Sequence, residues 1–237
     1  MGNIFRFFFL PVTALILISC SNINKQMSCE EILDTTYMNS SLNNFEKNKF
    51  KDLFINRYPE YDLMFQDAAD ETNIEKNLLA AISFQESQWD PKAISNMGVR
   101  GMMMVTLETA ALVGVEKRLN PEQNIKGGAR YFAMLMEKNK IGPTEADQLS
   151  IVLASYNLGP TNIIKVANLV SSNIEDVLWN EIKEELSMIK GEDLNLSDSG
   201  SYSRGQQAID YVDRVKNYYQ LLSAHSCVAP KDQLTFF

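Results

Sequence analysis

The helical spacing of apolar residues restricts what this chain can fold into. From residue 49 onward, apolar side chains recur at intervals of three and four residues, the period of one face of an α-helix. This pattern predicts a mainly α chain that folds as a single domain. The expected helices cover residues 49–58, 63–73, 74–87, a short stretch after 106, 121–139, 145–158, 162–169, 174–189 and 206–224.

Capping residues mark several of these boundaries. Thr106, Asn120 and Thr144 each precede a predicted helix, and their side chains can accept a hydrogen bond from its first turn. Pro121 suits the first position of a helix. Asn73 is the expected end of the helix that begins at residue 63.

Glycines indicate turns and close approaches. Gly98 and Gly101 favour a turn or a small β-hairpin over residues 95–104. Gly127 and Gly128 lie inside a predicted helix, where each costs about 1 kcal/mol relative to Ala, so we expect another backbone to approach them closely. The polar stretch 191–203 predicts a loop.

Size and charge narrow the possible functions. A chain of 237 residues, 45% of them hydrophobic, can bury a substantial core. The net charge is −8, and no cluster of basic residues stands out. We therefore expect no nucleic-acid partner, because binding to phosphate requires a basic surface.

The N-terminus has the features of an export signal. Arg6 precedes an apolar run over residues 7–19, which is too short to span a bilayer but suits a secretory signal. The run ends in Leu17-Ile18-Ser19-Cys20, which resembles the lipobox of bacterial lipoproteins. That likeness implies cleavage before Cys20 and acylation of its thiol. The alternative is an ordinary signal peptide in which Cys20 has no special role.

These features predict four segments. Residues 1–19 form the signal peptide, 20–45 a tether with a possible short helix in its second part, 46–228 the folded domain, and 229–237 a C-terminal tail. Ser21 is compatible with sorting to the outer membrane. We expect a protein that is lipid-anchored on the periplasmic side of that membrane. Cleavage removes one basic and no acidic residue, so the mature chain is even more negatively charged and is not attracted to anionic lipid. The acyl chains on Cys20 would therefore supply the anchoring.

Two cysteines remain in the mature chain, Cys29 and Cys227. An exported protein meets an oxidising compartment, so they are candidates for a disulfide. Closing so long a loop would stabilise the fold by roughly 4 to 5 kcal/mol in the chain-entropy account. The alternative is two free thiols near the chain ends.

Glu86 is the leading candidate for a catalytic group. It ends an apolar helical run near Phe84, Trp89 and three consecutive methionines, surroundings that would raise the pKa of its carboxyl group toward that of a general acid. The alternative is a helix-end carboxylate paired with a Lys or Arg. Asp90 is a poor second carboxylate, because Pro91 disfavours helical geometry at residue 90.

Other chemistries have little support in the sequence. His225 is the only histidine, and we expect it to be a surface or terminal residue. A zinc site or a His-dependent triad needs more partners than this. No glycine pattern typical of phosphate or dinucleotide binding is present. We expect no cofactor and no metal.

Four motifs together carry a family resemblance. They are residues 81–106, with a Glu-Ser pair and a later Gly-x-x-Gly-Met segment; residues 120–131; residues 155–159; and the pair Tyr211-Val212. In order and spacing they resemble the lytic transglycosylases of the goose-type lysozyme-like superfamily over roughly residues 60–220. The resemblance implies a lysozyme-like, goose-type single catalytic domain with at most a small β-hairpin, and peptidoglycan glycan strands as substrate.

The resemblance also implies a mechanism. Glu86 would act as the single general acid and base, splitting the bond between N-acetylmuramic acid and N-acetylglucosamine to leave a 1,6-anhydromuramyl end. Ser95 corresponds to a family serine near the acid, Tyr156 to a tyrosine near it, and Asn157 to a neighbouring amide. From the residues alone, Ser95 is also compatible with a plain turn and Tyr156 with the core.

Further residues are candidates for binding the glycan. Arg100 would pair with a substrate carboxylate, and Tyr211 would line the groove or simply pack. Met103 and Met104 would offer a soft surface to a sugar face, although core packing of at least one methionine is an equal alternative. Many relatives have Met-Gln where Met103-Met104 stand. The chain is most similar to a membrane-bound branch that carries a solute-binding-like domain ahead of the catalytic one, which we do not expect here.

Overall fold

The computed structural model describes residues 27–189 and 203–227 and is mainly helical. In chain order the helices are α1 (Cys29–Asn39), α2 (Asn44–Asn56), the 3-10 helix η1 (Tyr58–Glu60), α3 (Asp62–Thr72), α4 (Lys76–Ser87), α5 (Leu107–Val113), α6 (Pro121–Lys138), α7 (Glu145–Leu158), α8 (Pro160–Val170), the 3-10 helix η2 (Ile174–Asp176), α9 (Trp179–Met188) and α10 (Arg204–His225). Helix makes up 72% of the model, and the predicted mainly α class is confirmed.

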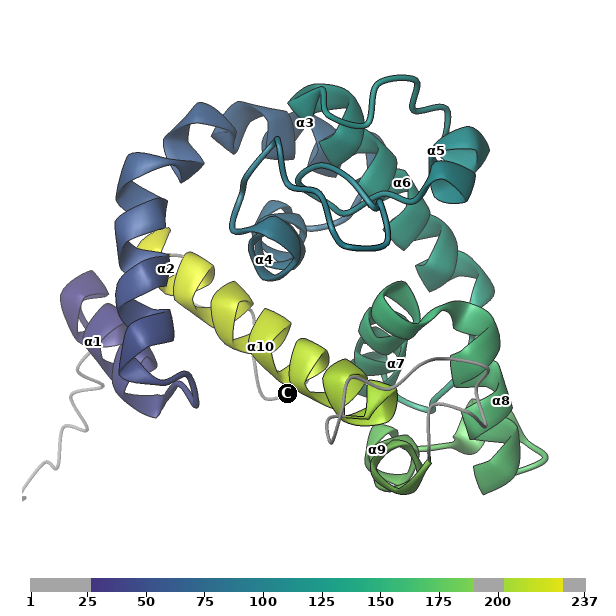
Figure 1. Ribbon diagram of the computed structural model, residues 1–237. Helices are drawn as coiled ribbons and strands as arrows, with labels where there is room; N and C mark the ends of the chain where they lie inside the picture. The colour runs from purple at the N-terminus through teal and green to yellow at the C-terminus, as the bar shows by residue number, and fades with distance from the viewer. Residues whose placement is uncertain (1–26, 190–202, 228–237) are drawn as a thin grey trace, which may run out of the picture.

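Helix α4 is the centre of the arrangement. Figure 1 shows it nearly end-on, surrounded by the other helices, with the long α10 running beside it. Helix α10 also packs against α7 and α9 on one side and α1 on the other, while α6 packs against α3 and α7. Every residue of α4 from Leu79 to Phe84 is buried, because helices and the loop that follows α4 surround it.

The predicted helix starts are confirmed at three caps. The side chains of Thr106, Asn120 and Thr144 each accept a hydrogen bond from the backbone N–H three residues later. Pro121 is the first residue of α6, as expected. Asn73 ends α3 in a left-handed conformation, with φ at 55°. Local side-chain chemistry thus decides these boundaries.

The helix predicted over 174–189 is wrong in its first part. The chain forms only a 3-10 turn over Ile174–Asp176 and is extended at Leu178 before α9 begins at Trp179. The backbone N–H of Trp179 donates to Asp147 Oδ1 of α7 at 2.9 Å. This tertiary hydrogen bond satisfies a donor in the first turn of α9 and starts the helix there.

The two glycines of α6 make the predicted close contact, but with side chains instead of backbone. A Cβ on Gly127 would lie 2.2 Å from Val115 Cγ2, and one on Gly128 would lie 2.4 Å from Met103 Cβ. The absence of side chains therefore lets α6 approach both the segment after α5, which contains Val115, and the loop after α4, which contains Met103.

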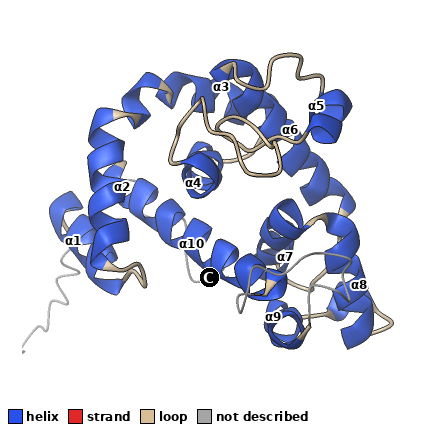
Figure 2. Cartoon of the chain, in the orientation of Figure 1, coloured by secondary structure: helices blue, strands red, loops and turns tan. Residues whose placement is uncertain are grey.

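That loop, residues 88–106, contains turns but no regular strand, as Figure 2 shows by its tan trace. Two isolated antiparallel bridges join Arg100 to Ile94 and to Val105. Gly101 adopts a positive φ of 83° and lies against the carbonyl of Arg118 so closely that a Cβ would be 2.2 Å from it. Only glycine fits this position.

The N-terminal helix lies within the segment expected to be a tether. Cys29, its first residue, forms a disulfide with Cys227, and their Cα atoms are 5.3 Å apart. Tyr37 and His225 form a hydrogen bond of 3.0 Å across the same contact. His225 also stacks on Phe54 at a centroid distance of 4.1 Å. The possible short helix within residues 20–45 is therefore present as α1, although it packs on the fold and is no free tether. His225 is the last residue of α10, as a terminal residue was expected to be, but it is half-buried among aromatic rings.

Several predictions fall outside the described residues. They concern the signal peptide over 1–19, the acylated Cys20, most of the loop over 191–203 and the tail over 229–237. Within residues 27–189 and 203–227, no helix is both long enough and apolar enough to cross a membrane.

Candidate active site

Glu86 occupies the last turn of α4, next to the point where the helix stops. Gln88 and Trp89 both adopt positive φ, at 55° and 59°, which turns the chain away. The indole N–H of Trp89 donates to the Ala80 carbonyl at 2.9 Å, and the ring is completely buried. A buried aromatic anchor thus compensates for the strained turn that follows Glu86.

Asp90 is a turn residue, as predicted. Its backbone N–H donates to the Ser87 carbonyl, and its carboxylate accepts from the backbone N–H of Lys92 at 2.9 Å. These bonds are typical of an Asx turn. Asp90 therefore holds the turn through these bonds, and the catalytic role of Glu86 stays a prediction.

Glu86 receives a hydrogen bond from the far end of the sequence. The hydroxyl group of Tyr211, on α10, donates to Glu86 Oε1 at 2.8 Å. Burial raises the pKa of Glu86 to about 7, and the bond from Tyr211 opposes part of that rise. The residue still keeps part of its surface accessible, so a substrate can reach a carboxyl group that the protein otherwise surrounds. Glu86 therefore has the pKa of a general acid at neutral pH.

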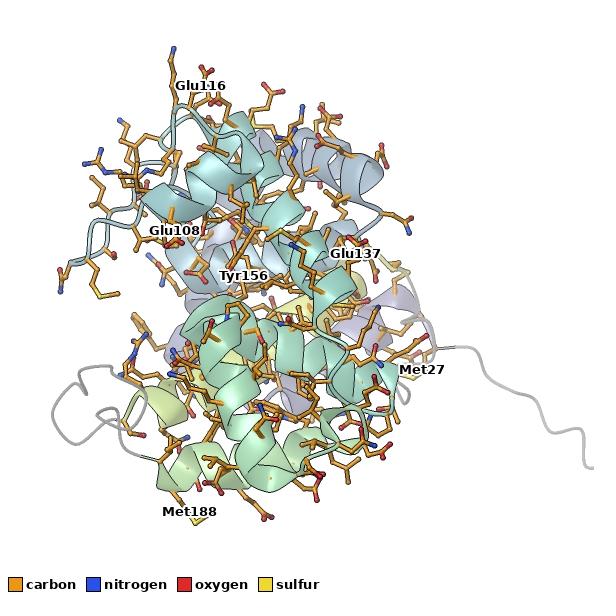
Figure 3. The ribbon with its side chains drawn as sticks, turned by 90° about the vertical axis from the view of Figure 1, so that its right-hand side faces the viewer. Met27, Glu108, Glu116, Glu137, Tyr156 and Met188 are labelled. Atoms are coloured by element: carbon orange, nitrogen blue, oxygen red, sulfur yellow. A yellow bond between two sulfur atoms is a disulfide. The ribbon has the colours of Figure 1, made fainter. Side chains whose placement is uncertain are left out.

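Tyr156, on α7, completes this group of polar side chains. Its hydroxyl donates to the Met103 carbonyl at 2.8 Å. Burial first, and then the negative charge of Glu86, raise the pKa values of both Tyr156 and Tyr211 well above 10. Both phenols are therefore neutral donors. Figure 3 shows Tyr156 where α6 and α7 meet, and its ring contacts Phe132 at a centroid distance of 6.1 Å.

The peptide group between Met102 and Met103 is fixed from two helices, α4 and α6. The Met102 carbonyl accepts from Ser83 at 3.1 Å and Ser87 at 2.9 Å, both on α4. The Met103 N–H donates to Asn124 Oδ1 of α6 at 2.7 Å. With the bond from Tyr156, these contacts hold the loop beside Glu86 in one position.

Asn124 is a residue whose importance the sequence reasoning missed. It is completely buried, and besides binding Met103 it donates to the carbonyls of Arg100 and Arg118 at 2.9 and 2.8 Å. Ser83 was missed as well. Its spacing of four residues from Ser87, which places both on one helix face, is the signal that would have indicated a shared partner.

The three consecutive methionines differ in burial. Met102 and Met103 are completely buried, and Met103 packs on Gly128. The expectation that the Met103 side chain faces a sugar is therefore wrong, because the space beside α6 encloses it. Met104 is half-buried, with a positive φ of 46°. Of the two methionines predicted to bind, only Met104 presents its side chain.

Ser95 and Arg100 lie on the loop that follows Glu86. Ser95 is partly buried, and its hydroxyl oxygen accepts from the Val99 N–H at 3.1 Å, which leaves its own proton to donate. Arg100 is exposed. Within the described part of the chain, no hydrogen bond or ion pair joins either residue to Glu86.

Asn157 follows Tyr156 at the end of α7. Its Oδ1 is buried and has no hydrogen-bond partner among the described residues. An unsatisfied buried acceptor is uncommon and costs about 1–3 kcal/mol. The side chain therefore has an unused capacity to accept a hydrogen bond, one residue after Tyr156 in the chain.

The described residues hold no group of three or more His, Cys, Asp or Glu side chains that could bind a metal ion. A cavity of about 510 Å³ lies elsewhere, between α4, α6, α7 and α10, and Glu86 does not line it. We locate the active site at Glu86 on chemical grounds, because the raised pKa and two neutral phenols coincide there.

Comparison with known proteins identifies the type of domain that this chain carries. Residues 63–177 match the family model described as "Transglycosylase SLT domain". Membrane-bound lytic murein transglycosylase F 1 of Alkalilimnicola ehrlichii is 40% identical over 167 residues, 70% of this chain and 34% of the relative. Membrane-bound lytic murein transglycosylase F of Marinobacter nauticus is 37% identical over 188 residues, 76% of this chain and 38% of the relative.

A solved structure supports the fold. The crystal structure of an inactive mutant of the lytic transglycosylase Slt from Pseudomonas aeruginosa matches 86% of this chain and 32% of its own, with a TM-score of 0.53 and 15% sequence identity. The predicted lysozyme-like fold is confirmed. The chain spans about a third of the length of the curated relatives that it matches. Over residues 63–177 it carries an SLT domain, and the chain is similar to the lytic transglycosylases named above.

Proposed function

We propose that this protein is a peptidoglycan lytic transglycosylase that splits the β-1,4 bond between N-acetylmuramic acid and N-acetylglucosamine. The observation that carries this proposal is the carboxyl group of Glu86, whose pKa of about 7 keeps much of it protonated at neutral pH. The SLT domain and the names of the relatives support the choice of substrate.

In the first step, Glu86 donates its proton to the glycosidic oxygen as the bond to C1 of the muramyl residue breaks. Tyr211 donates to Oε1 of this carboxyl group. We therefore assign the transferred proton to Oε2, the oxygen that Tyr211 does not hold. The 2-acetamido group of the substrate stabilises the cationic centre at C1, which removes the need for a second carboxylate.

In the second step, the ionised Glu86 takes the proton of the C6 hydroxyl of the same muramyl residue. The C6 oxygen then bonds to C1 and closes the 1,6-anhydro ring. The carboxyl group returns to its protonated form, and no water is consumed. One residue serves as acid and then as base, for which a pKa near neutrality is well suited.

The neighbouring residues position the reacting groups. Tyr211 holds the carboxyl group, and Tyr156 holds the loop through the Met103 carbonyl. Ser95, Arg100, Met104 and Asn157 are proposed contacts of the glycan strand. Ser95 has a proton to donate and Asn157 an acceptor to offer, which suits the acetamido group of a sugar.

The protein acts, in this proposal, on the periplasmic side of the outer membrane. Residues 1–19 direct export, and an acylated Cys20 anchors the mature chain. The relatives named above are membrane-bound by name, and the lipobox-like sequence supplies the chemistry for a lipid anchor. Metabolic labelling with a fatty acid tests this: Cys20→Ser should abolish the label, and a labelled variant would contradict the anchor.

The reaction is tested by digesting purified cell wall and separating the products by mass. We expect muropeptide ends lighter by one water than hydrolysed ends. Reducing ends alone would make the protein a muramidase. Glu86→Gln should release almost nothing, with Asp90→Asn as the matched control, because Asp90 is a nearby carboxylate used only in the turn. If parent and Glu86→Gln both bound the wall without releasing products, the protein would be a glycan-binding lipoprotein.

A further inference from the structure

The cavity of about 510 Å³ described above lies on the three helices that also carry Glu86, Tyr156 and Tyr211. Helix α4 contributes Leu78, eight residues before Glu86; α7 contributes Leu149, seven residues before Tyr156; and α10 contributes Tyr219. At 1.5 Å per residue, these positions are about 10–12 Å along each helix from the catalytic side chains. The cavity has a volume of about 510 Å³ and is separate from the site at Glu86.

The inner wall of this cavity is apolar. Phe132 is completely buried and Leu149 nearly so, and Leu78 and Met136 pack against the same core. Phe132 also contacts the ring of Tyr156. The wall can therefore bind an alkyl chain, and it separates that chain from the active site by one aromatic ring.

The polar groups of the cavity are mainly hydrogen-bond acceptors. Its charged lining residues are Glu75 and Glu145, both acidic and exposed. Two of the lining side chains already donate: Tyr219 to Glu75 Oε2, and one amide N–H of Gln148 to the Gly142 carbonyl at 2.9 Å. The side-chain amide of Asn73 adds both donors and an acceptor to the lining. This leaves Gln148 Oε1 as a further acceptor.

We propose that this cavity binds a primary ammonium group carried on an alkyl chain, as in a lysine-type side chain. An ammonium group brings three donors and a positive charge to a site rich in acceptors and negative charge. Its alkyl stem lies against Phe132 and Leu149, which removes apolar surface from water. An anionic or neutral chain of the same length lacks this match. The site is independent of which glycan reaction Glu86 performs.

The test uses n-hexylamine at pH 7, where the amine is charged, with n-hexanol and hexanoate as probes of equal chain length. Binding to the isotope-labelled chain is followed by NMR shifts of backbone amides. We expect saturable shifts centred on Glu75, Gln148 and Leu149, with hexanol weaker by about tenfold and hexanoate weaker still. Equal affinity for hexylamine and hexanol, or shifts centred on Glu86, would overturn the proposal.

Variants test the role of the carboxylates. Glu75→Gln and Glu145→Gln should each weaken hexylamine roughly fivefold and leave hexanol unchanged. Glu137→Gln is the matched control, since Glu137 is an exposed acid on α6, marked in Figure 3, that does not line the cavity. Melting curves check that the variants fold, and the three probes on the parent remain a test if they do not. Sedimentation showing a dimer that hexylamine dissociates would assign the cavity to a second copy of the chain and overturn the proposal.

Discussion

The hydroxyl of Tyr211 lies 2.8 Å from Glu86 Oε1 and joins two residues 125 positions apart. The contact brings the last helix of the described chain, α10, to the end of the central helix α4. It holds one oxygen of the only carboxyl group that the proposed reaction uses. The account of catalysis depends on this pair.

We predict that activity falls at alkaline pH, about tenfold for each pH unit above 7, because the acid must be protonated and the pKa of Glu86 is about 7. The bond from Tyr211 lowers this pKa, so Tyr211→Phe should move the alkaline limb to higher pH. It should also reduce the maximal rate, because the carboxyl group loses its support. Rates of wall digestion from pH 5 to 9 check both effects. If the alkaline fall in rate occurred at the same pH in Tyr211→Phe as in the parent, the hydrogen bond from Tyr211 would not lower the pKa of Glu86.

Glu86 should also make folding stability depend on pH. The folded state keeps the proton up to about pH 7, whereas the unfolded chain releases it near the ordinary pKa of 4.5. The unfolded state is therefore favoured increasingly as pH rises from 4.5 to 7, by up to about 3 kcal/mol. Glu86→Gln cannot ionise, so it should be more stable than the parent at pH 8 and similar at pH 4. Denaturant titrations at the two pH values measure the free energies of unfolding of variant and parent. If the variant differed from the parent by the same amount at pH 4 and pH 8, the pKa of Glu86 would not be raised in the folded state.

The hydrogen bonds that fix the peptide between Met102 and Met103 predict that two substitutions destabilise the fold by unequal amounts. Asn124→Ala removes three buried hydrogen bonds and should destabilise the fold by about 2–4 kcal/mol. Ser87→Ala should cost only about 0.5–1 kcal/mol, because Ser83 still donates to the Met102 carbonyl. Chemical unfolding of the two variants checks the order, and a reversed order would contradict the proposed clamp.

The disulfide predicts that Cys29→Ser and Cys227→Ser each destabilise the fold by about 2–5 kcal/mol. The double variant should be no worse than either single one, because all three lose the same bond. Thermal unfolding measures the effect. Alkylation of the exported protein with and without reductant checks the bond itself, and two thiols that react without reductant would show that it does not form.

Local signals predicted much of this fold. The caps at Thr106, Asn120 and Thr144 could be predicted because a capping side chain acts within its own turn. Helix α9 could not, since its start depends on a bond from Trp179 to Asp147 that exists only after the helices pack. The same reasoning applies to His225, whose aromatic neighbours come from α1 and α2.

The candidate site also contains features that could be predicted from the sequence and features that could not. The apolar sequence context made Glu86 a candidate, whereas Tyr211 was named only through the family resemblance. Their hydrogen bond could not be predicted, because periodicity gives the face of a helix and not its partner. Met103 was misjudged because a methionine beside glycines in a loop resembles surface, whereas Gly128, on another element, makes room to bury it.

The central claim is that Glu86 acts as both acid and base without consuming water. The most direct test is to digest purified cell wall in isotopically labelled water and to determine the mass of the new glycan ends, with Glu86→Gln alongside. The account predicts anhydromuramyl ends that contain no labelled oxygen, and no new ends in the variant. Ends that carry one labelled oxygen, or undiminished digestion by Glu86→Gln, would contradict it.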